Sequence, residues 1–488
     1  MSDVTVVGSG PNGLVAAVVA ARAGLDVLVL EAEDTIGGAT RTAELTLPGF
    51  RHDVGSAVHP AALASPVLRE LGLLGEAGAA RGLRWIVPEL SYAHPMPGGG
   101  AGLAWRDLER AVAGLGADGG DWRRLVGPLV SRIEGVVDFT GSQLLRVPRD
   151  PVAALRFGAR AVDQGTSLWS SRFTGAVASA LFTGVIAHAA GRLPNLASAG
   201  AGLLLAAHGH AAGWGFPAGG AQRIADALAA ELRRLGGRIE TGVRVRELAE
   251  VRGSRAVLLD TGPALLRTAQ LPRRYARALD RFRPGSGVAK VDFALDGPVP
   301  WASAEVGLAP TVHLGGTRSE IAAAENAVAA GRQPGTDGAP KHPFVLVTQP
   351  SVLDASRAPA GKHVLWAYTH VPAGSTFDAS ELITAEVERF APGFRDLVLA
   401  STASSAVELE RGNANLVGGD LGGGATTLAQ LVKRPVVSRT PWRTPVEGVY
   451  LCSASTPPGP AVHGMNGWYA ARLALRERFG IRLPELRA

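Results

Sequence analysis

Three glycines near the N-terminus have the spacing of a phosphate-binding turn. Gly8, Gly10 and Gly13 stand in the run GSGPNG, in which Pro11 and Asn12 separate the last two glycines. In such a turn the first glycine permits a tight bend, the second lets a pyrophosphate approach the backbone, and the third lets a helix pack closely on a strand. A helix N-terminus favours anions through its N–H groups and its dipole. We therefore expect all five residues to form a dinucleotide site.

The segments on either side of this turn must hold it in place. Residues 4–7 are apolar and predict a short buried strand, residues 14–23 predict an apolar helix, and residues 27–30 predict a second buried strand. Glu31 directly follows the second strand. A carboxylate at this place accepts hydrogen bonds from ribose hydroxyls, so we expect Glu31 and its neighbour Ala32 to contact the dinucleotide.

A pair of glycines indicates which dinucleotide is bound. Gly37 and Gly38 stand in DTIGGATRT, which resembles the diglycine motif after the second strand of FAD-binding oxidoreductases in the glutathione-reductase-like superfamily. The resemblance implies FAD as the cofactor, with Thr40 and Arg41 beside it. The fuller family pattern has an arginine two residues before the diglycine and another just after it, where this chain has threonine and alanine.

A second resemblance lies near the C-terminus. Residues 449–452 predict a short apolar strand, which runs into the turn-rich stretch SASTPPGPAVHG and then into an apolar helix. This looks like the C-terminal FAD motif of the phytoene-desaturase and amine-oxidase flavoproteins, and it implies FAD contacts from Ser455, Gly464, Met465 and Asn466. The chain's single cysteine falls within the strand, so we interpret it as a buried apolar residue and the flavin as non-covalently bound.

A third segment completes the expected cofactor domain. Residues 221–235 predict a helix that stops at a Gly-Gly pair, and a strand is expected at 238–245. In the same superfamily the corresponding strand passes the adenine, which implies a contact from Val243.

Together these motifs predict an α/β protein of two interleaved domains. A glutathione-reductase-like, FAD-binding Rossmann domain is expected to comprise residues 1–65, 214–275 and 440–488. The substrate domain is expected to be α+β, with a mixed sheet plus helices, and to comprise residues 66–213 and 276–439.

Several longer passages resemble one branch of these flavoproteins. They include LFTGVIAHAAGRLPN, NLVGGDLGGGATTLAQLVKRP and LCSASTPPGPAVHGMNGWYAA. Over nearly its whole length the chain is similar to the phytoene dehydrogenase-related FAD-dependent oxidoreductases, which include carotenoid desaturases and desaturase-like ketolases. The resemblance implies hydride transfer from a substrate C–H bond to flavin N5, by desaturation or a related oxidation of an apolar, isoprenoid- or polyene-like substrate. O2 or a quinone would then reoxidise the flavin.

Two other functions stay open at this point. An amine oxidase-like flavoenzyme would need a pocket for a cationic amine, and the chain has few aromatic residues, 6% of the total. A flavin-binding protein without turnover, acting as a partner or scaffold, would carry the same FAD motifs.

Two histidines are the candidates for catalysis. The family resemblance implies that His59 and His463 lie near the isoalloxazine, where either would orient the substrate or shuttle a proton. The alternative is that each makes only a structural hydrogen bond. His188, His208 and His210 fall in an uncharged region and are expected to be core or tunnel histidines.

Two segments bear on membrane association. Residues 173–191 carry no Lys, Arg, Asp or Glu and are long enough to cross a bilayer, but their many small residues favour buried helices that form the wall of an apolar substrate tunnel. Asp150 and Pro151 predict the start of a helix with apolar and basic residues. Such a helix either lies on a membrane surface, as a peripheral association, or presents a solvated face.

The composition limits the remaining possibilities. Among 488 residues, 46% are hydrophobic and 19% are charged, which is typical of a folded globular protein. Cys452 alone cannot form a disulfide or a dithiol relay, and no metal-ligand spacing stands out, so redox chemistry needs an organic cofactor.

The net charge of +6 is not gathered in a dense basic run, so no nucleic-acid partner is expected. The start of the chain is acidic and predicts a cytoplasmic protein, and a homo-oligomer is compatible with the sequence.

Overall fold

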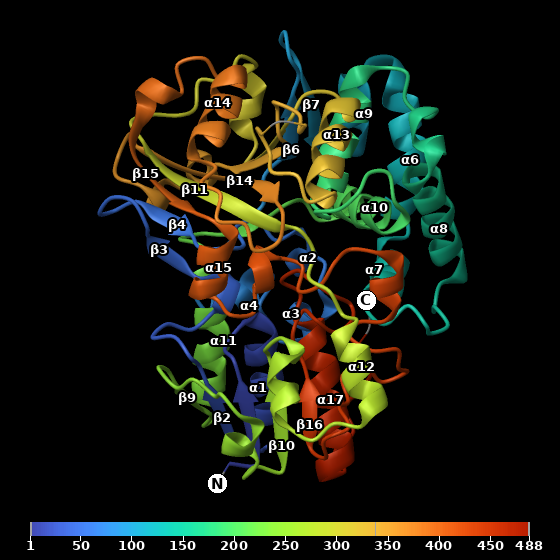
Figure 1. Cartoon of the computed structure of the whole chain (residues 1–488), viewed down its shortest axis with the longest axis vertical. Helices are drawn as coiled ribbons and strands as arrows, with labels where there is room; N and C mark the ends of the chain where they lie inside the picture. Colours follow the sequence, from blue (N-terminus) through green and yellow to red (C-terminus); the bar gives the residue numbers. More distant parts are fainter. Residues whose placement is uncertain (1, 337, 487–488) are drawn as a thin grey trace.

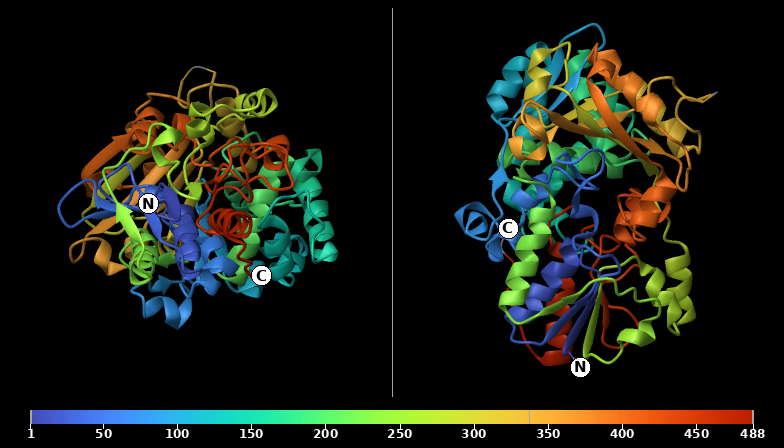
Figure 2. Two further views of the ribbon diagram at one scale, coloured as in Figure 1. Left: turned by 90° about the horizontal axis from the view of Figure 1, so that it is seen from below. Right: turned by 90° about the vertical axis from the view of Figure 1, so that its left-hand side faces the viewer.

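The computed structural model describes residues 2–336 and 338–486, which form a lower and an upper part (Figure 1). Within these residues the strands form one five-stranded sheet, one seven-stranded sheet and two two-stranded sheets. The five-stranded sheet lies in the lower part, and the two large sheets follow each other along the long axis (Figure 2). The fold is therefore mixed α/β with a Rossmann-type lower part, which confirms the predicted class.

The lower sheet is entirely parallel. Its strands, in spatial order, are β16 (Val449–Leu451), β10 (Ala256–Leu259), β1 (Val4–Val7), β2 (Val27–Leu30) and β9 (Arg238–Glu240). Most of its residues are apolar because both faces of a parallel sheet are covered. The strands come from three distant parts of the chain, as the motifs predict.

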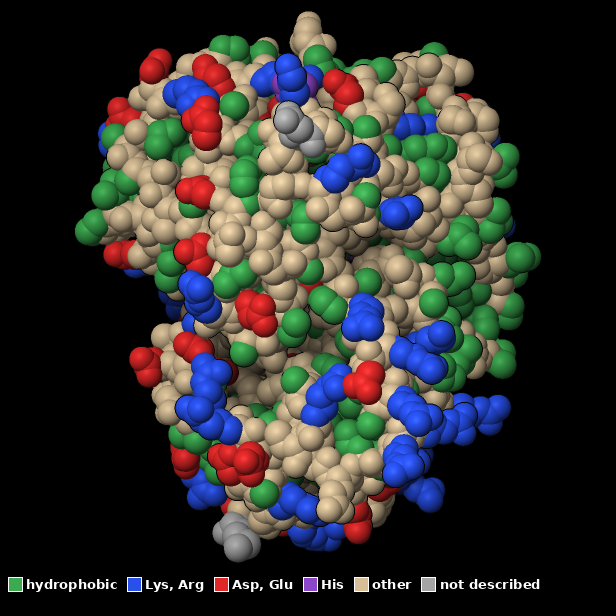
Figure 3. Space-filling view, viewed as in Figure 1, with side chains coloured by type: hydrophobic (Ala, Val, Ile, Leu, Met, Phe, Trp, Pro, Cys, Tyr) green, Lys and Arg blue, Asp and Glu red, His purple; other side chains and the backbone are tan. Residues whose placement is uncertain are grey.

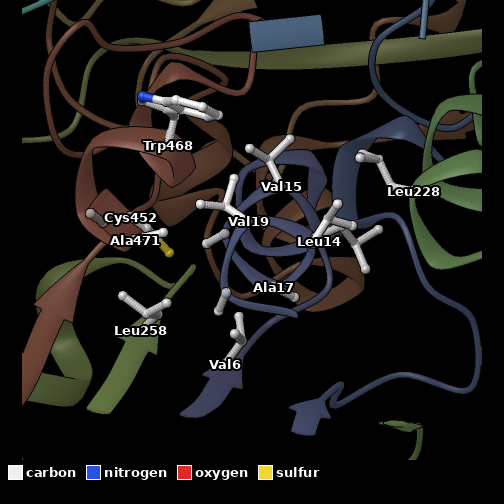
Figure 4. Packing of buried hydrophobic residues seen from close by; sticks show 14 of the residues in the cluster. Val6, Leu14, Val15, Ala17, Val19, Leu228, Leu258, Cys452, Trp468 and Ala471 are labelled. Atoms are coloured by element: carbon white, nitrogen blue, oxygen red, sulfur yellow. The ribbon is translucent and has the colours of Figure 1, made fainter. Parts of the chain in front are cut away.

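Three helices cover one face of this sheet. They are α1 (Pro11–Arg22), α11 (Gln222–Arg234) and α17 (Met465–Phe479). Figure 4 shows Leu14 and Val15 of α1 among the side chains of this core, together with Cys452 and Trp468. The predicted burial of the cysteine is thereby confirmed, and Trp468 packs in the core.

Other short elements complete the lower part. The opposite face of the sheet packs against α12 (Arg273–Asp280) and neighbouring turns. Residues of α3 (Pro66–Glu70) pack with α1, although they follow the expected domain boundary at residue 65. The short helices α2 (Pro60–Leu63) and α4 (Gly75–Ala79) also lie near this part, whereas α15 (Ala406–Gly412) and α16 (Leu428–Val432) lie against the upper part.

The upper sheet is mixed. In spatial order its strands are β15 (Val398–Ser404), β11 (Gly287–Leu295), β14 (His363–Val371), β13 (Val345–Thr348), β12 (Thr311–Leu314), β6 (Leu90–Pro95) and β7 (Ala101–Trp105). All neighbours are antiparallel except β12 and β6. The two-stranded sheets are β3 (Thr42–Glu44) with β4 (Arg51–Asp53), and β5 (Trp85–Ile86) with β8 (Phe216–Pro217).

Helices cover the upper sheet unequally. One face packs against α14 (Ser380–Phe390). The other face meets a larger helical layer, which appears on the right of Figure 1. Its helices are α5 (Leu108–Gly114), α6 (Gly119–Val130), α7 (Ile133–Thr140), α8 (Pro151–Gly165), α9 (Ala176–Ala187), α10 (Leu196–Ala211) and α13 (Arg318–Ala329).

The uncharged run at 173–191 and the helix predicted to start at Asp150 and Pro151 both belong to this helical layer. The uncharged run at 173–191 contains α9, which is buried along most of its length. Among the described residues, no helix is both long enough and apolar enough to cross a membrane. Asp150 caps α8 as predicted, because its Oδ1 accepts from the Ala153 N–H at 3.0 Å and Pro151 begins the helix.

The two parts are joined by buried charged residues. Lys290 of β11 donates to both carboxylate oxygens of Asp292, at 2.9 and 2.8 Å, and to the backbone oxygen of Asp53 at 3.0 Å. Arg357 pairs with the Asp53 carboxylate. A buried pair that also satisfies neighbouring polar groups fixes the orientation of its elements, here β4 against the upper sheet.

Two predicted elements differ from the observed ones. The helix expected at 14–23 begins earlier, at Pro11, because proline is well tolerated in the first turn. The predicted length of the strand at 238–245 was wrong, because β9 ends at Glu240. Gly242 then has φ +72°, a left-handed conformation that interrupts an extended strand.

Candidate cofactor and substrate site

A cavity of about 1220 Å³ lies between the two parts of the molecule. Its lower end is at the carboxyl ends of β1, β2 and β10, where ligands bind in open α/β sheets. Its upper end reaches α7, α8, α10 and the inner face of the upper sheet. We call the lower end the cradle, formed by residues 7–13, Glu31 and Asp260, and the upper end the chamber.

The glycines of the cradle have no room for a side chain. Gly8 has φ +97°, and a Cβ atom there would lie 2.8 Å from the backbone oxygen of Asp260. A Cβ atom on Gly10 would lie 2.5 Å from the carboxylate of Asp260, and one on Gly13 would overlap the backbone oxygen of Gly8. The close packing assigned to Gly13 is thus present, and the turn has the open backbone surface that a pyrophosphate requires.

Glu31 is held beside this turn. Its Oε2 accepts from the backbone N–H of Ser9 at 2.9 Å and from the Ser9 hydroxyl, and its Oε1 accepts from the N–H of Glu33 at 3.0 Å. The side chain lines the cavity. The carboxylate therefore has a fixed orientation at the place where a ribose would lie.

The adjoining lining is shaped by backbone contacts. The Val243 N–H donates to the backbone oxygen of Glu31 at 2.8 Å, which keeps residue 243 beside β2 even though the strand has ended. Thr40 donates to the Gly37 oxygen at 2.7 Å, and Arg41 Nε donates to the Gly38 oxygen at 3.0 Å.

The structure separates the predicted cofactor residues into two groups. Those that line the cavity are Gly8, Gly10, Pro11, Asn12, Glu31, Ala32, Gly38, Thr40, Arg41, Val243, Ser455 and Met465. Gly13, Gly37, Gly464 and Asn466 lie behind the lining. Asn466, for example, donates through Nδ2 to the backbone oxygens of Ser453 and Thr456, at 3.1 and 2.8 Å, and so shapes the C-terminal loop. A Cβ atom on Gly464 would lie 2.8 Å from Val15.

Sequence reasoning missed Asp260. It follows β10, and its Oδ2 accepts from the Gly13 N–H at 2.8 Å inside the first turn of α1. Burial raises the pKa of this carboxyl well above its usual range, and the nearby Glu31 carboxylate adds to the rise, while the hydrogen bond from Gly13 opposes it. An acid directly after an apolar strand is the same signal that identified Glu31, so the sequence contained the clue.

A glycine loop near the C-terminal segment was also not assigned a role. Gly422, Gly423 and Gly424 line the cavity and belong to a loop. Arg434 is buried beside them and also lines the cavity. It donates through Nε to the Ala454 oxygen at 2.8 Å and contacts the Gly422 oxygen. This arginine therefore fixes the glycine loop to the C-terminal FAD segment.

The two candidate histidines both line the cavity. His59 pairs through Nδ1 with the Ser56 hydroxyl at 3.1 Å, and its Nε2 has no hydrogen-bond partner among the described residues. His463 accepts the Met465 N–H through Nδ1 at 3.1 Å, at the start of α17. Burial lowers the pKa of each to about 4, so both rings are neutral at pH 7. Each makes the structural contact weighed above and also faces the cavity.

The chamber combines apolar helices with a more polar sheet face. Phe157 of α8 and Leu204 of α10 line the helical side. On the sheet side, His370 is paired through Nδ1 with both oxygens of Glu325 at 2.9 Å. His188 and His208 line the same space, and burial lowers their pKa values to about 3 and about 4. His210 instead bonds the Trp122 indole at 3.0 Å, in the core.

Comparison with known proteins is consistent with this geometry. The model of a family described as "NAD(P)-binding Rossmann-like domain" matches residues 6–71. The rat protein "Pyridine nucleotide-disulfide oxidoreductase domain-containing protein 2" is 25% identical over 97% of this chain and 93% of its own length. A limonene dehydrogenase subunit of Castellaniella defragrans is 34% identical over 23% of this chain and 19% of its own length.

Solved structures share the fold. A triple mutant of putrescine oxidase has a TM-score of 0.61, with 18% identity over 97% of this chain and 98% of its own. Together with the cradle, these findings assign the chain an FAD-type Rossmann fold and support an oxidoreductase of the flavin-dependent class.

Proposed function

We propose that the protein is an FAD-dependent oxidoreductase that takes a hydride from a C–H bond of an apolar, isoprenoid- or polyene-like substrate, by desaturation or a related oxidation. The observation that carries this proposal is the lining of the chamber. Among the cavity-lining residues from α7, α8, α10 and the upper sheet, none is Lys, Arg, Asp or Glu. A chamber whose helices and sheet contribute no Lys, Arg, Asp or Glu to the lining, next to a dinucleotide cradle, suits a substrate that brings no charge of its own.

The residues of the cradle would hold the cofactor. The glycine turn and the N-terminus of α1 would take the pyrophosphate, Glu31 the ribose, and the start of α17 the flavin's carbonyl edge. When bound, FAD supplies a hydride acceptor at N5. The chamber's residues then have to orient the substrate C–H bond and exclude water. In a desaturation the neighbouring carbon also releases a proton, which the neutral imidazole of His59 or His463 would accept.

The state of the histidines supports the same reaction. His59 and His463 are neutral at pH 7 because burial lowers their pKa values. They place hydrogen-bonding atoms beside the cavity without adding a cation, which suits orientation of a neutral substrate. The limonene dehydrogenase subunit, whose name refers to an apolar terpene, adds support through about one quarter of this chain.

An amine oxidase-like reaction is the alternative, and the fold shared with putrescine oxidase supports it. A cationic amine would need an anionic or aromatic partner when it leaves water. Trp366 and Tyr368 line the chamber and stack on each other with ring centres 5.7 Å apart, but among the described residues no carboxylate from α7, α8, α10 or the upper sheet lines the cavity. The lining thus favours the neutral substrate.

We also propose a peripheral membrane association through α8. Figure 3 shows hydrophobic side chains gathered on the side of the molecule where α8 lies, next to a group of Lys and Arg side chains. Leu155 on α8 is 74% exposed and Val147 just before the helix is 87% exposed. Exposed apolar residues beside arginines match an anionic membrane surface. Co-sedimentation with anionic vesicles, lost in Leu155→Ser, would support this docking, and no binding by the wild type would refute it.

Flavin spectra test the proposed reaction. The FAD-loaded protein is mixed anaerobically with a polyene or with a primary amine, and loss of the visible flavin absorbance is followed. We expect bleaching by the polyene alone. Bleaching by the amine alone would support the amine oxidase, and no bleaching across a broad panel would leave a flavin-binding partner or scaffold. The electron acceptor, O2 or a quinone, and a homo-oligomeric state stay predictions.

A further inference from the structure

Three polar side chains form a row across the chamber wall. Thr311 of β12 is directly opposite Thr348 of β13, which is directly opposite Trp366 of β14. Residues opposite each other in a ladder present their side chains on the same face of the sheet. All three line the cavity. We call them the polar row.

The polar atoms of this row are buried without a partner. Thr311 Oγ1, Thr348 Oγ1 and Trp366 Nε1 make no hydrogen bond within the described part of the chain. Buried hydroxyl and indole N–H groups nearly always have a partner. A purely apolar wall would be built with valine, which has nearly the shape of threonine, and the opposite face of the same strands does carry Val312 and Val347.

The row also faces the chamber without charge. The next position of the row, on β11, is Asp292, which is opposite Trp366. Its carboxylate is occupied by Lys290, and neither residue lines the cavity. The Lys290 ammonium lies 5.2 Å from the centre of the Trp366 ring, but neither this cation nor its paired carboxylate belongs to the cavity lining.

The donor and acceptor properties of the three groups specify a ligand. An indole N–H only donates, and a threonine hydroxyl donates or accepts, so each of the three groups can donate a hydrogen bond to an acceptor atom of a ligand. Resting on the function proposed above, we propose that the polar row binds a neutral oxygen atom, a carbonyl or hydroxyl, on a substrate that is otherwise apolar. The rest of the substrate then lies along the apolar side chains of α8 and α10.

A matched pair of probes tests this assignment. 2-Decanone and 2-methyl-1-decene have nearly the same shape, and the second has a CH2 group in place of the carbonyl oxygen. Each is titrated into the FAD-loaded protein by calorimetry. We expect the wild type to bind the ketone about tenfold more tightly than the alkene, because only the ketone gives the polar row a hydrogen-bond acceptor.

Variants of the row locate the preference. Thr348→Val should remove most of the tenfold preference by weakening ketone binding, with alkene binding unchanged, and Thr311→Val should act in the same direction. Thr348→Ser keeps a hydroxyl and should keep the preference. Thr369→Val is the matched control, because Thr369 is buried on β14 and does not line this cavity. Retained flavin and an unchanged melting temperature show that a variant is folded.

The outcomes separate this inference from the proposed function. Equal affinity of the wild type for both probes would overturn the row as a recognition site, and so would failure of both probes to bind protein that retains its flavin. A ketone preference that survives in both valine variants would overturn it as well. Flavin bleaching is read independently: a ketone preference without bleaching by any substrate would refute the reaction and leave the row standing.

Discussion

The cradle and the chamber are two ends of one cavity with opposite requirements. The cradle consists mainly of backbone and glycine, and its buried acid, Asp260, is favoured in the protonated form. The chamber consists of side chains, and burial favours the neutral form of two of its histidines, His188 and His208. Dinucleotide binding in the cradle should therefore be weakened by any added atom and by rising pH. The chamber should tolerate side chains of similar shape, but acid should destabilise the fold around it.

Adding one methyl group to the cradle should have the largest effect. In Gly13→Ala the new Cβ overlaps the backbone oxygen of Gly8, which cannot move without opening the turn. We expect the purified variant to retain less than about a tenth of the wild-type flavin, measured by absorbance, because misplaced backbone donors no longer meet the pyrophosphate. Gly114→Ala, at an open position in α5, is the control and should keep its flavin. Full flavin content in Gly13→Ala would contradict the close packing described for the turn.

Lowering the pH should destabilise the folded protein through the buried histidines that line the cavity. His59, His208 and His463 bind a proton below pH 6.5 in the unfolded chain but only below about 4 when folded. Stability present above pH 6.5 is therefore lost as pH falls toward 4, by about 3 kcal/mol for each histidine.

Urea unfolding at pH 7.5, 6 and 5 measures this loss. His208→Phe should lose less stability than the wild type over this range. An equal loss in His208→Phe and in the wild type would place the acid sensitivity elsewhere.

Removing the ribose acceptor should have an intermediate effect on the cradle. Glu31→Ala leaves two backbone N–H groups, of Ser9 and Glu33, without their acceptor and removes the expected bonds to the ribose. We expect FAD affinity to fall about tenfold, in line with the loss of a charged hydrogen bond. Fluorescence titration of the apoprotein gives the affinity, and Glu240→Ala, at the exposed end of β9, is the control. Unchanged affinity would remove Glu31 from the site.

The smallest effect should come from the charge of Asp260. Its raised pKa means that the folded protein holds a proton that the unfolded chain releases at lower pH, so stability and anion binding fall as pH rises through the raised pKa. Asp260→Asn keeps an acceptor for the Gly13 N–H without the charge. We expect its FAD affinity to stay level with pH, whereas the affinity of the wild type falls below it, by about fivefold, as pH rises through the raised pKa of Asp260. Affinities that decline in parallel with pH in both proteins would show that another group titrates.

The two ends of the cavity also differ in how far they could be predicted. The cradle is encoded by neighbouring residues, from Gly8 to Arg41, so its turn, strands and helix follow from local pattern, and the FAD-type fold was predicted correctly. Contact of individual residues with FAD stays a prediction. The strand at 238–245 was overestimated because one glycine conformation, at Gly242, ends it.

The chamber could not be predicted in the same way. The polar row joins residues 311, 348 and 366, which become neighbours only through the register of three strands. Each threonine taken alone is an ordinary strand residue. Asp260 is the intermediate case, since its place after an apolar strand is visible locally but its contact with Gly13 depends on the parallel pairing of β1 and β10.

The packing of α1 against α17 has a consequence for synthesis of the protein. These two helices share one core but come from opposite ends of the described chain. On the ribosome, α1 and its glycine turn emerge before α17 and remain without this partner until the upper part has been made. Such long-range pairing slows folding and leaves an apolar helix face exposed in the nascent chain. A bound dinucleotide would thus mark a chain that has completed its folding.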